Sequence, residues 1–420
     1  MMASRTLKNL LNLLIFFSLL VVFYILISGG QTHYFGSIKI RLNHLHNPLL
    51  IFSILLAIRL SLFKNHDFFL NKTILKFSEN YTEFTNNTKK EYFFYFLIII
   101  FFITLAYLRI FNNFFIREDF DYLQEAIKTN ENLLDIFSLR LGNLFRPLFN
   151  LLFLLNYKIS GLNPLGYYIV NYLIHIGNSV LLFYFTHTLT KNRFISFLAS
   201  LIFAVNFEHY QAVMHISSRP SSGSTMLYLL AIIFFSKYLI SKNKATYFAS
   251  VVTFGLSLLH YEGTVTLLPM MFLYDVFFHE RLKISNIPKY IKRYGLFAIL
   301  LMPYVFFQFT IHSKDPLITQ EALAFNLHFI YEIFRSTITI NEWIIPLFIV
   351  FIIFLGKYIT RKMLKDLVKN PVIIFSFLWI IVALFPFSFF QERSIVPSRY
   401  FYIPSVGSSI LLSFLIYQMY

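Results

Sequence analysis

Long apolar runs constrain the fold of this 420-residue chain more than any other feature. The first run extends from Leu10 to Ile27 without a charged residue, and about 17 to 25 such residues suffice to cross a bilayer. Only 13% of all residues are charged, against about 25% in soluble domains. A soluble globular fold is therefore excluded, and we expect an integral, multi-pass membrane protein.

The runs predict an all-α fold with about twelve transmembrane helices. We expect residues 1–91 to hold two helices and a cytoplasmic loop, and residues 92–418 to form a catalytic domain with a large outer loop, 113–165. The first run is too long for the apolar core of a signal peptide and is expected to be a retained helix. The twelve candidate spans are 9–29, 48–63, 92–112, 166–190, 194–208, 222–241, 245–260, 262–279, 294–311, 343–358, 371–389 and 400–418.

The distribution of basic residues predicts the orientation. If the N-terminus is cytoplasmic and the sides alternate, 22 of the 36 Lys and Arg residues fall in inner segments and 12 in outer ones, as the positive-inside rule requires. The basic residues responsible for the net charge of +16 lie between the apolar runs. This position indicates that they set the topology and contact membrane lipids, rather than bind a nucleic acid. The outer segments with residues of interest are then 113–165, 209–221, 260–262, 312–342 and 390–399.

Cysteine is absent, so thiolate nucleophiles, disulfides and cysteine-ligated metals are excluded. Chemistry must come from carboxylates, His, Tyr, Ser or Arg. Three acids, Glu118, Asp119 and Asp121, follow the third span within four residues. Acids at a membrane surface are costly to desolvate and suggest function, although acids also favour the first turn of a solvated helix.

Two further patterns on the outer side have both a functional and a structural interpretation. Arg146 stands before Pro147 near the interface, where a guanidinium can bind phosphate or extend to lipid headgroups. Asn171, His175 and Asn178 share one face of a predicted span. A polar stripe of this kind is more typical of helix packing than of a ligand site.

These residues together resemble the multi-spanning GT-C glycosyltransferases, and in particular bacterial relatives of the protein O-mannosyltransferase and TMTC-type enzymes. The resemblance covers about residues 92–418 and depends on the order of short motifs along the chain. The motifs are Glu118-Asp119-Phe120, Arg146-Pro147-Leu148, Gly161-x-Asn163-Pro164 with Asn171 and His175, Arg219, Tyr261-Glu262, and Arg399-Tyr400-Phe401-Tyr402-Ile403-Pro404.

The resemblance implies transfer of a sugar from a polyprenyl-phosphate donor to a protein, lipid or glycan acceptor, at the outer face of a bacterial plasma membrane. It implies that the acidic pair supplies the catalytic carboxylate; we favour Asp119 as the base and Glu118 as its partner. At Tyr261-Glu262 the family usually has Lys-Glu, and Glu262 is a supporting candidate with Asn171, His175 and Tyr400. No cofactor is certain, and a divalent cation held by the acidic pair and the phosphate stays open.

The chemistry also follows from the residues themselves. An acceptor hydroxyl that attacks a sugar C1 needs a general base, and a single displacement inverts that carbon. Arginines stabilise the charge that grows on a departing phosphate, and the candidates on the predicted outer side are Arg146, Arg219, Arg393 and Arg399.

Two other classes of protein fit the same hydropathy pattern. A transporter or lipid-sugar flippase would share the many spans and the arginines, but such proteins often place paired charges at corresponding positions of two repeats. A surface-polysaccharide polymerase or ligase would also use lipid-linked sugars. The acids of this chain are concentrated in one outer loop, which favours an enzyme working at the outer face.

Overall fold

The computed structural model is described over most of the region after residue 87. The described residues are 9–18, 20–21, 31–35, 38–42, 88–139, 144–280, 287–312, 369–389 and 398–419, with four single positions besides. The predicted spans 48–63 and 343–358 lie outside this set, apart from three isolated positions in the first of them.

The chain divides into two compact units. Unit 1 comprises Met1–Ala106 and Ile338–Leu364, and unit 2 comprises Tyr107–Thr337 and Lys365–Tyr420. Unit 1 includes most of helix α4 (Thr88–Tyr107), in which buried Glu91 accepts a hydrogen bond from the Tyr95 hydroxyl at 2.9 Å. The candidate site residues from Glu118 to Tyr400 belong to unit 2 where they are described.

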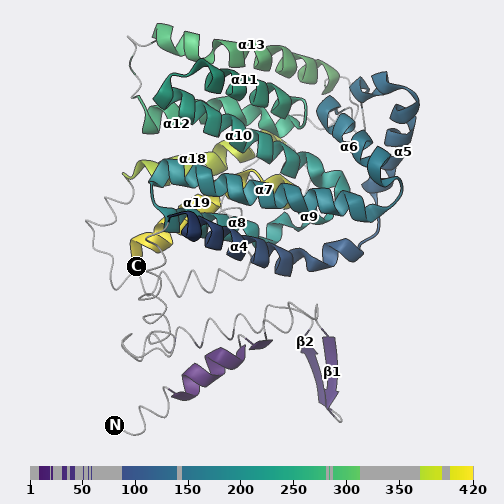
Figure 1. Ribbon diagram of the computed structural model, residues 1–420, viewed down its shortest axis with the longest axis vertical. Helices are drawn as coiled ribbons and strands as arrows, with labels where there is room; N and C mark the ends of the chain where they lie inside the picture. The colour runs from purple at the N-terminus through teal and green to yellow at the C-terminus, as the bar shows by residue number, and fades with distance from the viewer. Residues whose placement is uncertain are drawn as a thin grey trace. The chain divides into compact units, whose positions relative to one another are not determined.

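Helices form nearly all of the described regular structure (Figure 1). Their bounds are α4 Thr88–Tyr107, α5 Glu118–Glu131, α6 Pro147–Ser160, α7 Pro164–Thr190, α8 Arg193–Ala204, α9 Tyr210–Met214, α10 Arg219–Ser241, α11 Lys244–Leu258, α12 Leu267–Phe278, α13 Ile287–His312, α18 Pro371–Leu384 and α19 Pro404–Met419. Short 3-10 helices are η2 Leu108–Asn112, η3 Leu133–Phe137, η4 Phe207–His209, η5 Ile216–Ser218, η6 Glu262–Thr266, η8 Phe385–Phe389 and η9 Ser398–Phe401.

One β-hairpin departs from the predicted all-α class. Strands β1 (Gln31–Phe35) and β2 (Ile38–Leu42) pair antiparallel, with Phe35 opposite Ile38. Only Gly36 and Ser37 separate the strands, and a glycine first in a two-residue loop favours a hairpin. Helical hydrophobic runs flank this segment in the sequence, which is why a strand was not predicted there.

Four described helical stretches are long and apolar enough to cross a membrane: Lys90–Asn112, Pro164–Thr190, Ile216–Ser241 and Ile287–Gln308. The count of twelve spans is therefore not confirmed. Several predicted spans correspond to shorter helices. The predicted span 262–279, for example, is a 3-10 helix, Glu262–Thr266, followed by an α-helix of 12 residues, Leu267–Phe278. The predicted span 9–29 is described as a helix over Asn9–Ser18.

Asparagine and proline set many helix starts in unit 2. The Asn163 side chain accepts a hydrogen bond from the Leu165 amide, with Pro164 in the first turn of α7, and Asn370 starts α18 in the same way. Such side chains satisfy backbone amides that a helix start leaves open. Gly161, with a φ of +55°, ends α6. The Gly161-x-Asn163-Pro164 motif thus forms the turn between α6 and α7.

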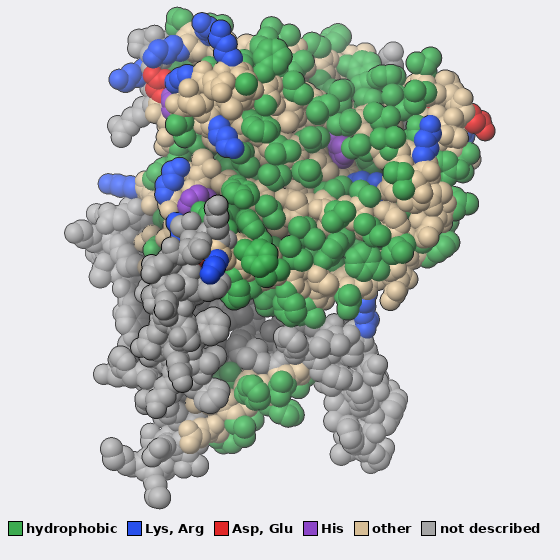
Figure 2. All heavy atoms as spheres, in the orientation of Figure 1, with side chains coloured by type: hydrophobic (Ala, Val, Ile, Leu, Met, Phe, Trp, Pro, Cys, Tyr) green, Lys and Arg blue, Asp and Glu red, His purple; other side chains and the backbone are tan. Residues whose placement is uncertain are grey.

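Unit 2 exposes many apolar side chains and buries polar ones together with apolar ones. Figure 2 shows hydrophobic side chains over most of its visible face, and α13 exposes Ile291, Ile299, Met302 and Phe306. Small and polar side chains lie in the interior, where α10 packs on α7 and α11 and α8 packs on α7 and α19. This distribution suits a bundle surrounded by lipid, since membrane helices associate through small and hydrogen-bonding residues.

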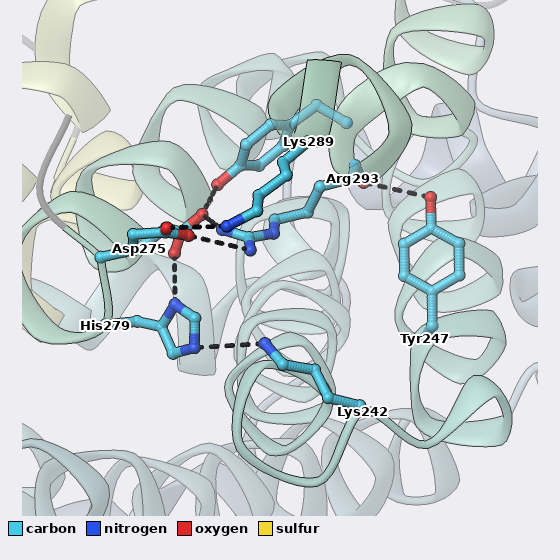
Figure 3. A network of polar contacts seen from close by, with 8 residues as sticks. Lys242, Tyr247, Asp275, His279, Lys289 and Arg293 are labelled. Atoms are coloured by element: carbon cyan, nitrogen blue, oxygen red, sulfur yellow. Dashed lines mark hydrogen bonds and ion pairs between the residues drawn. The ribbon is translucent and has the colours of Figure 1, made fainter. Parts of the chain in front are cut away.

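A buried ion pair joins α12 to α13 (Figure 3). The Asp275 carboxylate is fully buried and pairs with the Arg293 guanidinium. It also accepts a hydrogen bond from the Tyr294 hydroxyl at 2.7 Å and contacts His279 Nδ1 at 3.0 Å. His279 Nε2 in turn lies 3.3 Å from Lys242 Nζ. Lys242 follows α10 and Arg293 belongs to α13, so the network connects the ends of α10, α12 and α13; alternating sides predict all of these ends on the inner side.

Candidate active site

Side-chain contacts bring together four of the five outer segments named in the sequence analysis. Glu118 of segment 113–165 pairs with Arg399 of segment 390–399 at 3.1 Å. Arg146 pairs with Glu262 of the corner 260–262 at 2.5 Å, and Asp119 binds the backbone of segment 209–221. The fifth segment, 312–342, lies outside the described residues apart from His312. The four segments therefore lie together in the fold, and their place on the outer side of a membrane stays a prediction.

The Arg146–Glu262 pair is held in place by the backbone. Pro147 begins α6 directly after Arg146, and the Leu148 amide donates to the Leu259 carbonyl at 3.0 Å, which joins α6 to the end of α11. Arg146 Nε and Nη2 then donate to the two Glu262 oxygens at 2.8 and 2.5 Å. Burial alone would lower the pKa of Arg146, but the Glu262 carboxylate outweighs burial and holds that pKa above its usual range.

Glu118 occupies the first position of α5 and is accessible. Its side chain is 51% exposed, and one carboxylate oxygen accepts from Arg399 Nη1 at 3.1 Å. The Arg399 amide donates to the Gln211 side chain at 3.2 Å, which fixes η9 against α9. Arg117 precedes Glu118 with a φ of +44°, a conformation that costs a non-glycine residue about 1–3 kcal/mol.

Asp119 is fully buried and bonded to the backbone. One carboxylate oxygen accepts from the Ser217 amide at 2.7 Å, and the other accepts from the Ile116 amide at 3.1 Å. These bonds connect the start of α5 to η5 and to the turn before α5. Asp119 therefore holds the neighbouring Glu118 in position, and its two oxygens already have backbone donors.

Both ion pairs belong to one cluster around two tyrosines. The charges of Arg146, Glu118, Glu262 and Arg399 all act on the buried Tyr122 of α5, whose pKa is raised mainly by burial. Tyr261 lies among the same groups, with its ring 5.1 Å from the Arg146 guanidinium carbon. We call this set the outer cluster: Glu118, Tyr122, Arg146, Tyr261, Glu262, Arg399 and Tyr400.

Arg219 is only 2% exposed, and its guanidinium donates hydrogen bonds within the helix bundle. Its Nε donates to the Asn171 side chain at 2.7 Å, and its Nη2 donates to the Tyr167 carbonyl at 3.1 Å. The Asn171 amide also donates to the carbonyls of Val213 and His215. These contacts join α7 to the loop before α10, and a role of Arg219 at the donor phosphate stays a prediction.

The polar stripe on α7 packs helices together, as its pattern favours. His175 Nε2 donates to the Ala204 carbonyl at 3.0 Å, so its Nδ1 accepts from the Tyr402 hydroxyl at 2.7 Å. Asn178 donates to the same hydroxyl at 3.1 Å and to the Ser222 carbonyl at 2.8 Å. The stripe thus connects α7 with α8, α10 and the start of α19.

The remaining candidates have different positions. Tyr400 stacks on Phe387 with ring centroids 4.5 Å apart, and its own ring lies 5.6 Å from the Arg399 guanidinium carbon. Arg393 lies outside the described residues. Within the described part of the chain, no group of three or more His, Asp or Glu side chains is placed to hold a metal ion.

Sequence reasoning missed Tyr122, and it quoted Tyr261 only as part of a motif. Tyr122 follows Glu118 by four residues, so both lie on the same face of α5. That spacing could have identified Tyr122 once α5 was known to be a helix. No pattern in the sequence indicates that the carboxylate of Glu118 would pair with Arg399, because 281 residues separate them.

The fold and the outer cluster define a helical membrane protein with paired charges and tyrosines at one end of a helix bundle. The chain is similar to human protein O-mannosyl-transferase TMTC2, with 34% identity over 169 residues, which is 39% of this chain and 20% of the relative. It is 32% identical over 132 residues to Tmtc1 of Drosophila melanogaster (31% and 15%). It is 30% identical over 204 residues to tmtc2 of Xenopus laevis (44% and 24%).

These relatives confirm the resemblance to TMTC-type transferases. The chain spans only about a fifth of the length of the human relative. No family model matches the sequence, and no solved structure matches it.

Proposed function

We propose that this protein is a glycosyltransferase that moves a sugar from a polyprenyl-phosphate donor to an acceptor hydroxyl at the outer face of a membrane. The observation that carries the proposal is the outer cluster itself, in which an accessible carboxylate, Glu118, is fixed by Arg399 beside a second Arg–Glu pair. The names of the relatives, protein O-mannosyl-transferases, support a mannosyl donor and a protein acceptor.

The reaction is an inverting displacement at the sugar C1. The acceptor oxygen forms a bond to C1 while the bond from C1 to the phosphate oxygen breaks, and its electron pair goes to the phosphate. The acceptor proton goes to a carboxylate acting as general base. The guanidinium groups of Arg146 and Arg399 stabilise the charge that develops on the departing phosphate.

We propose Glu118 as the base, with Asp119 as the residue that positions it. The sequence favours Asp119, but both Asp119 oxygens accept backbone amides and the side chain is fully buried. Glu118 is accessible and uses one oxygen for Arg399. An acceptor hydroxyl needs an oxygen within hydrogen-bond reach, and Glu118 can provide it without unfolding the start of α5.

The test is transfer from a synthetic polyprenyl-phosphate mannose to a Ser/Thr peptide by purified protein. Glu118→Gln should lower the rate about a hundredfold to ten-thousandfold with little change in Tm. Glu125→Gln is the matched control, since Glu125 lies on the same helix and forms an ion pair with the exposed Lys128 at 3.2 Å; its rate should be that of wild type.

Other outcomes would change the assignment. If Asp119→Asn is inactive at an unchanged Tm while Glu118→Gln is active, Asp119 is the base. If both variants transfer sugar normally, the outer cluster is not the active site. If wild type moves the lipid-linked sugar across vesicles without transferring it, the protein is a flippase or another transporter.

A further inference from the structure

The Tyr261 hydroxyl is a buried polar group without a well-aligned hydrogen bond. The residue is 2% exposed, and no described residue provides its hydroxyl with a hydrogen bond of good geometry. The Ser221 side chain donates at most a weak hydrogen bond to the phenol oxygen, which leaves the phenol proton available to a ligand. A buried hydroxyl left without a partner costs about 1–3 kcal/mol. A buried polar group with incomplete hydrogen bonding calls for a specific explanation, and a bound molecule that completes the bonding is one.

The surroundings fix the ring of Tyr261 in place. Arg146 lies over one side, with its guanidinium carbon 5.1 Å from the ring centroid. Gly263 packs against the ring so closely that a Cβ at this position would lie 2.5 Å from a ring carbon. Tyr261 also begins η6 in an extended conformation. The hydroxyl is therefore held in one position within the outer cluster.

The neighbouring charges indicate what that hydroxyl binds. Arg146 uses Nε and Nη2 for Glu262, and within the described residues no hydrogen bond involves its third nitrogen, Nη1. Arg399 and Tyr400 act on Tyr261 from the other chain segment. Burial, followed by the Glu262 charge, raises the pKa of Tyr261 well above its usual range, so the phenol keeps its proton at neutral pH and can donate it.

We propose that Tyr261 donates a hydrogen bond to a phosphate oxygen of the polyprenyl-phosphate donor, beside Arg146 Nη1. The proposal rests on the proposed function, since it assigns a ligand group to the same cluster. A phosphate oxygen suits both donors, because hydrogen bonds to an ionised acceptor are about twice as strong as neutral ones. Tyr261 is thus a donor-binding residue, and the carboxylate chemistry belongs to Glu118.

The test is binding of a short-chain polyprenyl phosphate and of the matching polyprenyl alcohol to purified full-length protein. Tyr261→Phe removes only the hydroxyl. We expect affinity for the phosphate to fall about tenfold or more, affinity for the alcohol to stay unchanged, and Tm to stay equal or rise, because an unpartnered buried hydroxyl has been removed. Tyr247→Phe is the control: its hydroxyl donates to the Arg293 carbonyl at 3.1 Å, so its loss should lower Tm and leave phosphate binding unchanged.

A second variant tests the position of the ring. Gly263→Ala should displace Tyr261 and weaken phosphate binding as well. Phosphatidylglycerol vesicles serve as the competing source of phosphate: if they displace the polyprenyl phosphate at equal lipid concentration, the site binds headgroups and the proposal is wrong.

The outcomes separate this inference from the proposed function. Unchanged phosphate affinity in Tyr261→Phe, in a protein that still transfers sugar, overturns only the role of Tyr261. A wild-type protein that neither binds polyprenyl phosphate nor transfers sugar overturns both. Equal loss of phosphate and alcohol binding in Tyr261→Phe would assign the hydroxyl a role in shaping the site and would refute the phosphate contact.

Discussion

The Arg146–Glu262 pair gives the sharpest energetic prediction for the outer cluster. Glu262→Gln keeps the size of the side chain but removes the charge that both Arg146 donors face. Breaking a buried ion pair costs about 3–5 kcal/mol, because the remaining charge is left without compensation. The Arg146 side chain is 10% exposed and that of Glu262 is 29% exposed, so water compensates part of the loss and we expect about 2–3 kcal/mol.

Arg146→Lys tests the geometry of the same pair. An ammonium keeps the charge but cannot donate two parallel bonds to one carboxylate, so we expect a smaller loss of about 1 kcal/mol. The double variant should lose less than the sum of the single variants, since the two side chains share one interaction. The expected coupling energy is at least about 1 kcal/mol.

Thermal unfolding in detergent, followed by tryptophan fluorescence, measures these differences. The indole of Trp379 is fully buried and donates to the Ile403 carbonyl at 2.9 Å, so it reports on the packing of unit 2. Glu125→Gln breaks an exposed pair and should change stability by less than about 1 kcal/mol. If Glu262→Gln is as stable as this control, or if the two single variants are additive, the pair does not form.

Three further predictions concern the rest of the described fold. Arg117→Gly should stabilise the protein by about 1 kcal/mol in denaturant titration, because glycine relieves the positive φ that precedes α5; a loss of stability would contradict the strain. Asp275→Asn should destabilise by about 3–5 kcal/mol, since it leaves the buried Arg293 guanidinium with only the longer 3.5 Å contact to Glu280 among the described residues. Glu280→Gln, which loses this contact and an exposed pair with Lys289, should change Tm much less. In this cysteine-free chain, a Cys at Lys128 should react with an impermeant maleimide in intact cells and a Cys at Lys244 should not; the reverse labelling would invert the predicted topology.

Hydropathy determined the class of the protein, because runs of apolar residues require a membrane around them. This inference depends on an average over many residues, so single errors matter little. Charge predicted the sides of the segments, and these sides stay a prediction, although segments 113–165, 209–221, 260–262 and 390–399 do lie together in the fold. The helix starts at Asn163 and Asn370 were also readable in principle, since a capping side chain acts within its own turn.

Individual partners were decided only by the tertiary structure. Nothing local to Glu118 and Asp119 distinguishes an accessible carboxylate from one that holds the backbone, since that difference arises from the Ser217 amide and Arg399 guanidinium, both distant in sequence. The place where α11 ends also depends on a neighbouring helix. The Leu259 carbonyl, just after this end, accepts a hydrogen bond from the Leu148 amide of α6. Hydropathy averaged along the sequence was therefore enough to predict a membrane protein. Which charged side chains pair was decided by contacts between segments that are far apart in the sequence.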